Sequence, residues 1–262
     1  MKLYLLMIST ILLAQASTLS MEENEMLVVA HRGYSSKAPE NTIAAFNMAI
    51  AAGADYFECD VHRCKSGEIV VIHDETVDKT TNGSGKVSDF TLEQLKELSA
   101  GYSQKFGNQF ETERIPTLNQ VLKLAKGQIK VEIEIKAQGL AANVVKLVKE
   151  LKMEQDVIII SFDFNEVKTA KALAPEIETM YLVGAIWGEK ELEKVKAIGA
   201  EYLGPYLIPS KKKVKMAHEM GIKVLPYTIN DKKAISKALR NRVDGIATDY
   251  PERVLELRRN FR

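Results

Sequence analysis

The sequence predicts an α/β protein of the (β/α)8 TIM-barrel class, with an extra antiparallel hairpin strand and a short insertion after it. Short apolar runs typical of strands alternate along the chain with amphipathic segments, which is the pattern of βαβ units. Runs such as Val157–Ile160 are apolar throughout, as parallel strands covered on both faces require. The length of 262 residues fits a single barrel-sized domain.

Nine segments have the composition of strands. They are Leu27–His31, Tyr56–His62, Ile69–His73, Ile129–Lys136, Val157–Phe162, Thr179–Val183, Tyr202–Tyr206, Lys223–Ile229 and Gly245–Asp249. Only residues 63–68 separate the second from the third, and a parallel crossover needs about a dozen residues or more. These two segments therefore pair as an antiparallel hairpin, which leaves eight parallel strands for the barrel.

Nine segments have the amphipathic pattern of helices. They are Asn41–Ala52, Leu92–Leu98, Leu118–Lys126, Leu140–Lys152, Phe164–Leu173, Glu189–Ile198, Lys211–Met220, Lys232–Leu239 and Glu252–Arg259. Glycines such as Gly53 and Gly199 follow helical segments, where a helix end favours them. The stretch from Glu75 to Pro116 is an insertion before the next barrel strand, and its Thr80–Gly85 is a loop by composition.

Residues 1–20 resemble a signal peptide. Lys2 precedes a largely apolar run from Leu3 to Ala14, and Ala14-Gln15-Ala16 provides a small-x-small cleavage site. The run is short for a transmembrane helix, although a retained membrane anchor is the alternative. We expect a periplasmic or secreted domain at residues 21–262, with no stable membrane span after cleavage.

The composition argues against nucleic acid as a partner and against stabilisation by a disulfide. The formal net charge of +1 argues against nucleic acid, whose partners usually carry a basic face. The only cysteines, Cys59 and Cys64, lie on one extended segment, about 16 Å apart and too far for a disulfide. Cys59 is interpreted as a core residue, with metal ligation as the alternative.

Polar residues gather where three predicted barrel strands end. They are His31 and Arg32 on the first strand, Glu58 and Asp60 on the second, and Glu134 and Lys136 on the third. Barrel enzymes place their active sites at this end of the strands. We therefore predict that these side chains meet at one rim.

The acidic residues among them predict a metal site. Glu58 and Asp60 are two residues apart and share a strand face, as do Glu132 and Glu134. Buried unpaired charges are costly, and a divalent cation bound by Glu58, Asp60 and one of the other two would remove that cost. Ligation by carboxylates alone suits Mg²⁺ or Ca²⁺. The alternative is salt bridging to neighbouring cations.

The basic residues are predicted to bind phosphate. Arg32 offers forked donors and Lys136 a point charge, although both could serve as ion pairs within the barrel. His31 and His73 are the candidate catalytic pair. A two-residue turn at Ser66-Gly67 would place His73 directly opposite Asp60.

The motifs, taken in order, resemble those of glycerophosphodiester phosphodiesterases. They are His31-Arg32-Gly33, Pro39-Glu40-Asn41-Thr42, Gly53-Ala54-Asp55, Glu58-x-Asp60-Val61, Val70-Val71-Ile72-His73-Asp74, Thr80-Thr81-Asn82-Gly83-x-Gly85, Ile115-Pro116-Thr117-Leu118, Glu134-Ile135-Lys136, Ser161-Phe162-Asp163 and Asp244-Gly245-Ile246-x-Thr248-Asp249-x-Pro251. The resemblance extends over residues 27–260.

The resemblance implies a role for each matching residue. His31 and His73 would be general acid and base, in an order left open, and Glu58, Asp60 and Glu134 would bind Mg²⁺ or Ca²⁺. Phosphate would be held by Arg32 and Lys136. Tyr227 stands where the family commonly has Trp, so it is expected to contact substrate and to alter substrate preference. Glu132 is a possible neighbour of the metal.

The implied reaction converts a glycerophosphodiester, a small-molecule substrate, to an alcohol and glycerol 3-phosphate. The nucleophile is either water or the 2-hydroxyl of the substrate. A lysophospholipase D-like or sphingomyelinase D-like activity on lipids is the alternative; it would use an apolar rim such as Trp187 or Tyr206-Leu207-Ile208. A binding protein without turnover is a third interpretation.

Overall fold

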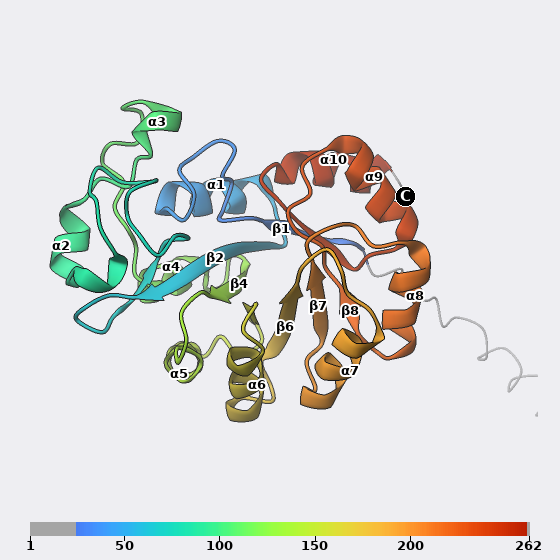
Figure 1. Cartoon of the computed structure of the whole chain (residues 1–262). Coiled ribbons are helices and arrows are strands. Elements are labelled where there is room, and N and C mark those ends of the chain that lie inside the picture. Colours follow the sequence, from blue (N-terminus) through green and yellow to red (C-terminus); the bar gives the residue numbers. More distant parts are fainter. Residues whose placement is uncertain (1–24, 261–262) are drawn as a thin grey trace, which may run out of the picture.

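The computed structural model describes residues 25–260 and contains a nearly closed barrel of eight parallel strands surrounded by helices (Figure 1). The barrel strands are β1 (Leu27–Ala30), β2 (Tyr56–Arg63), β4 (Lys130–Ile135), β5 (Val157–Ser161), β6 (Glu178–Val183), β7 (Tyr202–Pro205), β8 (Lys223–Val224) and β9 (Gly245–Thr248). The predicted (β/α)8 class is confirmed. The predicted signal peptide at residues 1–20 lies outside the described residues and stays a prediction.

The strands follow the order β8-β7-β6-β5-β4-β2-β1-β9, and each neighbouring pair in this order is parallel. Backbone hydrogen bonds join the two end strands. The Asp244 amide donates to the Val224 carbonyl (2.9 Å), and Ala247 donates to Pro226 (3.1 Å). These bonds between the β8 and β9 segments nearly close the barrel. Within the strand order, β9 lies beside β1.

Eight helices cover the outside of the barrel in the described part of the chain. They are α1 (Ile43–Ala52), α4 (Leu118–Ala125), α5 (Ala141–Leu151), α6 (Phe164–Leu173), α7 (Glu189–Ile198), α8 (Lys211–Glu219), α9 (Lys232–Asn241) and α10 (Pro251–Asn260). Side-chain caps fix several N-termini: Thr42 begins α1 and Asp163 begins α6, as N-cap preferences favour. Gly53 ends α1 in the left-handed region, with φ 75°.

A hairpin extends β2 beyond the barrel. The short strand β3 (Ile69–Val71) pairs antiparallel with β2, and Val61 lies opposite Val71. The predicted register was wrong by one residue. The turn contains three residues rather than two, because the Cys64 amide donates to Glu68 (3.0 Å) and Gly67 adopts a φ of 101°. Such a three-residue loop needs glycine at its left-handed position.

The corrected register places Ile72, not His73, opposite Asp60. The Ile72 amide donates to the Asp60 carbonyl (3.0 Å), and β3 itself ends at Val71. His73 therefore follows the paired segment instead of belonging to it, and its position depends on local contacts described below.

Residues 75–116 form the predicted insertion, at the end of β2 and remote from α7 and α8 (Figure 1). It contains the 3-10 helix η1 (Val87–Asp89) and the short helices α2 (Leu92–Glu97) and α3 (Ser103–Phe106). The sequence predicted α2 but not η1 or α3. A separate apolar cluster that includes Val70, Val87 and Leu95 attaches this insertion to the hairpin.

The main core has two layers. The barrel interior contains apolar side chains such as Ile158, Met180 and Leu225, while a larger cluster including Phe46 and Ile133 lies between strands and helices. Cys59 and Cys64 are buried and free, which confirms the core interpretation of Cys59. Within residues 25–260, no helix combines the length and apolar character that crossing a bilayer would need.

Candidate active site

The loop after β1 makes a sharp turn that presents two candidate site residues. Arg32 and Gly33 both lie in the left-handed region, with φ values of 56° and 77°. A Cβ added to Gly33 would lie 2.7 Å from the Ala45 backbone of α1, so glycine permits this close approach. The turn orients His31 and Arg32 toward the carboxyl end of the barrel.

His31 is fixed by a carboxylate that follows the last strand of the barrel. Its Nδ1 lies 2.8 Å from Oδ1 of Asp249. Ser35 Oγ donates to the same oxygen (2.9 Å), and Asn230 Nδ2 donates to Oδ2 of Asp249 (2.6 Å). Burial opposes ionisation of Asp249, but the bonds from His31 and its other donors hold its pKa well below the usual range. Because Nδ1 is engaged, Nε2 is the ring nitrogen left to face substrate.

Four acidic residues form a two-by-two array on adjacent strands. Glu58 on β2 pairs with Glu132 on β4, and Asp60 pairs with Glu134 two residues further along. Glu58, Asp60 and Glu134 each offer an oxygen, and these three atoms lie within 4.8 Å of one another. The prediction that these three carboxylates converge is therefore met by the geometry.

The carboxylates fit a divalent cation. Glu58 Oε1 and Asp60 Oδ1 are buried and have no hydrogen-bond partner among the described residues. Unsatisfied buried acceptors are costly, and oxygen-only ligand sets are those that Mg²⁺ and Ca²⁺ use. A cation at the convergence point would satisfy both atoms, with Glu58, Asp60 and Glu134 as its protein ligands.

The protonation behaviour of the cluster reflects burial and mutual repulsion. Burial, followed by the charges of Asp60 and Glu134, raises the pKa of Glu58. Burial and the Asp60 charge raise the pKa of Glu134 to about 7. The pKa of Asp60 is lowered, because the charges of Arg32, His73 and Lys136 outweigh the effect of burial. A bound cation would therefore stabilise the ionised form of these buried carboxylates.

Arg32 lies between two carboxylates. Its Nη1 donates to Glu40 Oε1 (2.8 Å) and its Nε lies 3.3 Å from Asp60 Oδ2. Lys79 of the insertion also bonds Glu40, at 3.1 Å. These contacts set the direction of the guanidinium, a group suited to phosphate oxygens.

Lys136 connects the acidic array to the second candidate histidine. Its Nζ lies 2.8 Å from Glu134 Oε1 and 3.2 Å from His73 Nε2. The Nδ1 of His73 is bonded to Asp74 Oδ1 (2.6 Å), so each candidate histidine has a carboxylate behind it. Burial, together with the charges of Arg32 and Lys136, lowers the pKa of His73.

Tyr227 forms one wall of the site. With His31, Glu58 and Glu134 it lines a small cavity of about 20 Å³ inside the barrel mouth. Its ring meets Phe162 and Tyr206 edge-on, with centroid distances of 5.8 and 6.0 Å. The aromatic wall that the sequence indicated is therefore present beside the acidic array.

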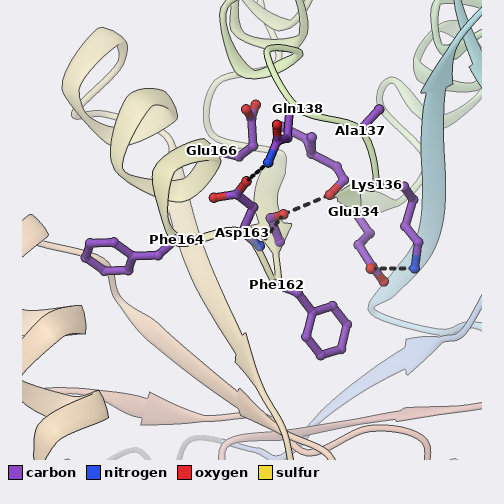
Figure 2. A pocket seen from close by; sticks show the side chains of 10 residues that line it. Glu134, Lys136, Ala137, Gln138, Phe162, Asp163, Phe164 and Glu166 are labelled. Atoms are coloured by element: carbon purple, nitrogen blue, oxygen red, sulfur yellow. Dashed lines mark hydrogen bonds and ion pairs between the residues drawn. The ribbon is translucent and has the colours of Figure 1, made fainter.

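A larger cavity of about 560 Å³ opens beside Glu134 and Lys136. Figure 2 shows Phe162, Asp163 and Gln138 around it, with Gln138 bonded to Asp163 at 3.3 Å. This cavity offers room for part of a substrate next to the predicted phosphate-binding lysine.

The structure brings all the predicted site residues to one end of the barrel, while their roles stay predictions. Sequence reasoning assigned no role to Asp249, Asp74, Glu40 or Asn41, which bond the predicted residues directly. His62, to which sequence reasoning also assigned no role, is buried, and its Nε2 lies 3.0 Å from the His73 carbonyl oxygen. The signal was its position two residues after Asp60, on the same strand face. His218 is exposed.

Comparisons with known proteins agree on one family. Residues 31–253 match the glycerophosphoryl diester phosphodiesterase family. A glycerophosphodiester phosphodiesterase of Caldanaerobacter subterraneus subsp. tengcongensis is 41% identical over 239 residues, covering 88% of this chain and 97% of the relative. One from Bacillus altitudinis is 32% identical, over 90% of this chain and 99% of the relative.

Solved structures give the same result. A phosphodiesterase of Oleispira antarctica, solved in complex with the product sn-glycerol-3-phosphate, is 31% identical with a TM-score of 0.80, over 88% of this chain and 95% of that chain. A glycerophosphodiester phosphodiesterase of Agrobacterium tumefaciens is 30% identical with a TM-score of 0.77, over 88% and 99% of the two chains.

Proposed function

The chain belongs to the glycerophosphoryl diester phosphodiesterase family, and from that premise we propose how its site performs the family's reaction. The protein is a glycerophosphodiester phosphodiesterase, and its substrate is a small glycerophosphodiester. We propose that it releases an alcohol and glycerol 3-phosphate by general acid and base catalysis with two histidines, supported by a divalent cation. The names of the relatives favour this reaction over the lipid-directed alternative.

The observation that carries the proposal is the pairing of each histidine with a carboxylate beside the acidic array. Asp249 holds His31 and Asp74 holds His73, each through Nδ1. Proton transfer would then use the two Nε2 atoms, with His73 exchanging its 3.2 Å contact to Lys136 Nζ for a contact to substrate. One would take a proton from the nucleophile, which is water or the substrate's 2-hydroxyl, and the other would give a proton to the departing alcohol oxygen. Such transfers contribute about 10²–10⁴-fold to rate.

Arg32 and Lys136 would hold the phosphate. Both reach the rim beside Asp60, and their donors suit the non-bridging phosphate oxygens. Glu58, Asp60 and Glu134 would hold Mg²⁺ or Ca²⁺, which when bound supplies Lewis-acid stabilisation of negative charge developing on the phosphate. The metal dependence and the identity of the ion belong to the proposal.

The test is hydrolysis of glycerophosphocholine by single histidine variants. We expect His31→Ala and His73→Ala each to lower kcat by at least about 100-fold. His218→Ala is the matched control, because His218 bonds Asp244 on the exposed surface of α8. Near-normal turnover by either site variant would refute the two-histidine assignment. Chelation followed by re-addition of Mg²⁺ or Ca²⁺ tests the metal requirement separately.

The sequence of residues 1–20 supports a proposed location in the periplasm or outside the cell. N-terminal sequencing of protein recovered from those compartments would test it, and a chain that still begins at Met1 would contradict cleavage.

A further inference from the structure

Glu132 is the member of the acidic array that the proposed cation site leaves unused. Its side chain is 1% exposed, and its Oε1 has no hydrogen-bond partner among the described residues. It does not belong to the group whose ligand atoms converge within 4.8 Å. A wholly buried carboxyl without a partner is expensive to retain, so its presence needs a reason.

The neighbours of Glu132 indicate that reason. Glu132 pairs with Glu58 in the β2–β4 register, and adjacent strands are about 4.8 Å apart, with paired side chains on the same face. Oε1 of Glu58 is also buried and without a partner. The two unsatisfied oxygens therefore belong to adjacent side chains.

Both residues line the small cavity at the barrel mouth. Its volume is about 20 Å³, and one water molecule needs at least about 10–15 Å³ together with two or more polar partners. Glu58, Glu132 and Glu134 line the cavity and can supply those partners, and its apolar lining includes Ile160, Met180 and Leu225. The cavity thus has the size and the polarity for one water molecule.

The charges in this region also point to a cation. The four carboxylates of the array are accompanied by two neighbouring side-chain cations, Arg32 and Lys136. With the cation bound and all four carboxylates ionised, one divalent ion would balance them against these two side-chain cations. The array as a whole, including Glu132, is therefore matched in charge to a single divalent cation.

We infer that Glu132 is a fourth acidic residue of the cation centre, acting on the ion through a water molecule held in the small cavity that Glu132 and Glu58 both line. This inference rests on the proposed function, because it extends the proposed ligand set of Glu58, Asp60 and Glu134. Glu132 is a positioning residue: it strengthens cation binding without a direct bond to the ion. Residues that orient metal ligands in this way typically contribute about 10–100-fold to metal affinity.

The test measures cation binding directly, by isothermal titration calorimetry of the full-length, metal-free protein with Mg²⁺ and with Ca²⁺. We expect Glu132→Gln, which keeps the shape and removes the charge, to weaken binding by at least about 10-fold. Asp163→Asn is the matched control, since it removes one negative charge at the same rim and asparagine also caps a helix well. Its affinity should stay within about twofold of the original protein, because Asp163 lies outside the array.

A second variant removes the hydrogen-bonding atoms as well as the charge. Glu132→Leu suits the apolar part of the cavity lining, which includes Ile160, Met180 and Leu225, so it is the variant to use if Glu132→Gln fails to fold. We expect it to weaken binding at least as much. Unchanged cation affinity in Glu132→Gln, or an equal loss in Asp163→Asn, would overturn the inference.

These outcomes are distinct from failure of the proposed function. If the unaltered protein binds neither cation, the proposed metal dependence fails and the inference fails with it. If the unaltered protein binds and Glu132→Gln binds equally well, the proposed three-ligand site stands and only the role of Glu132 is overturned.

Discussion

Asp249 Oδ1 lies 2.8 Å from His31 Nδ1, so a residue at the end of the last barrel strand holds a residue at the end of the first. The same carboxylate accepts bonds from Ser35 and Asn230. Its low pKa keeps it ionised. It therefore fixes both the orientation of the imidazole and the nitrogen that carries its proton.

Replacing this carboxylate should affect catalysis more than substrate binding. In Asp249→Asn the amide can no longer stabilise a charged His31 ring or select its tautomer. We expect kcat to fall by about 100-fold, with a much smaller change in KM, in steady-state assays on glycerophosphocholine. Asp244→Asn is the control, because Asp244 forms a 2.8 Å bond with His218 outside the site. Equal losses in the two variants would contradict the role of Asp249.

Removal of the Glu40 charge should weaken substrate binding. Glu40 holds the Arg32 guanidinium at 2.8 Å, and Glu40→Gln weakens that bond while leaving the arginine in place. We expect KM to rise by about 10-fold, corresponding to the loss of roughly 1.4 kcal/mol from a charge-assisted bond. Lys79→Met, which removes the other cation on Glu40, should change KM less than twofold. A larger effect of Lys79→Met would indicate that the lysine itself binds substrate.

Gly33→Ala in the turn after β1 should lower the free energy of unfolding more than Gly53→Ala does. Gly53→Ala places a Cβ in open space at a φ of 75°, and the strained backbone should cost about 1–2 kcal/mol. Gly33→Ala adds a collision at 2.7 Å with Ala45, which should cost about 1–3 kcal/mol more. Urea unfolding of both variants measures the difference. Equal costs would show that α1 moves aside without penalty.

The metal-free protein should lose stability as the pH rises above 6.5. Burial raises the pKa of Glu132 to about 8 and that of Glu134 to about 7, against 4.5 for an ordinary glutamate. Between 4.5 and 8 the folded state therefore binds more protons than the unfolded state, and stability decreases with pH. The stability contributed by these protonated groups is lost as the pH passes through their folded-state pKa values.

Thermal unfolding of chelated protein at pH 6.5 and pH 8.5 measures this effect, and the midpoint should be lower at pH 8.5. Saturating Mg²⁺ should reduce the difference, because a bound cation favours the ionised carboxylates. A midpoint that rises with pH in the chelated protein would contradict the assigned directions of both pKa shifts.

Strand and helix positions could be predicted because their signals are local. The apolar runs that became β5 and β6, and the pattern that became α7, match the structure to within a residue. The register of the β2–β3 hairpin could not be predicted so directly, because Ser66-Gly67 also fits a three-residue loop that begins at Lys65. One extra loop residue moves every opposite pair.

His73 shows why a wrong register did not displace the site. The paired segment ends before it, and its position is set by contacts with His62, Asp74 and Lys136. The contacts with His62 and Lys136 join residues that are separated in the sequence, and they leave no periodic signal. Asp249 is similar: its motif was recognised, but its bond to His31 exists only because β9 lies beside β1.

The neighbouring position of β1 and β9 has a consequence for synthesis. During synthesis, His31, His73 and every candidate metal ligand are made well before Asp249, which follows the last barrel strand, β9. Until β9 pairs with β1, His31 lacks its bond to Asp249 and the barrel is open at this edge. Hydrolysis should therefore begin only after the last strand has paired with β1 and Asp249 has reached His31.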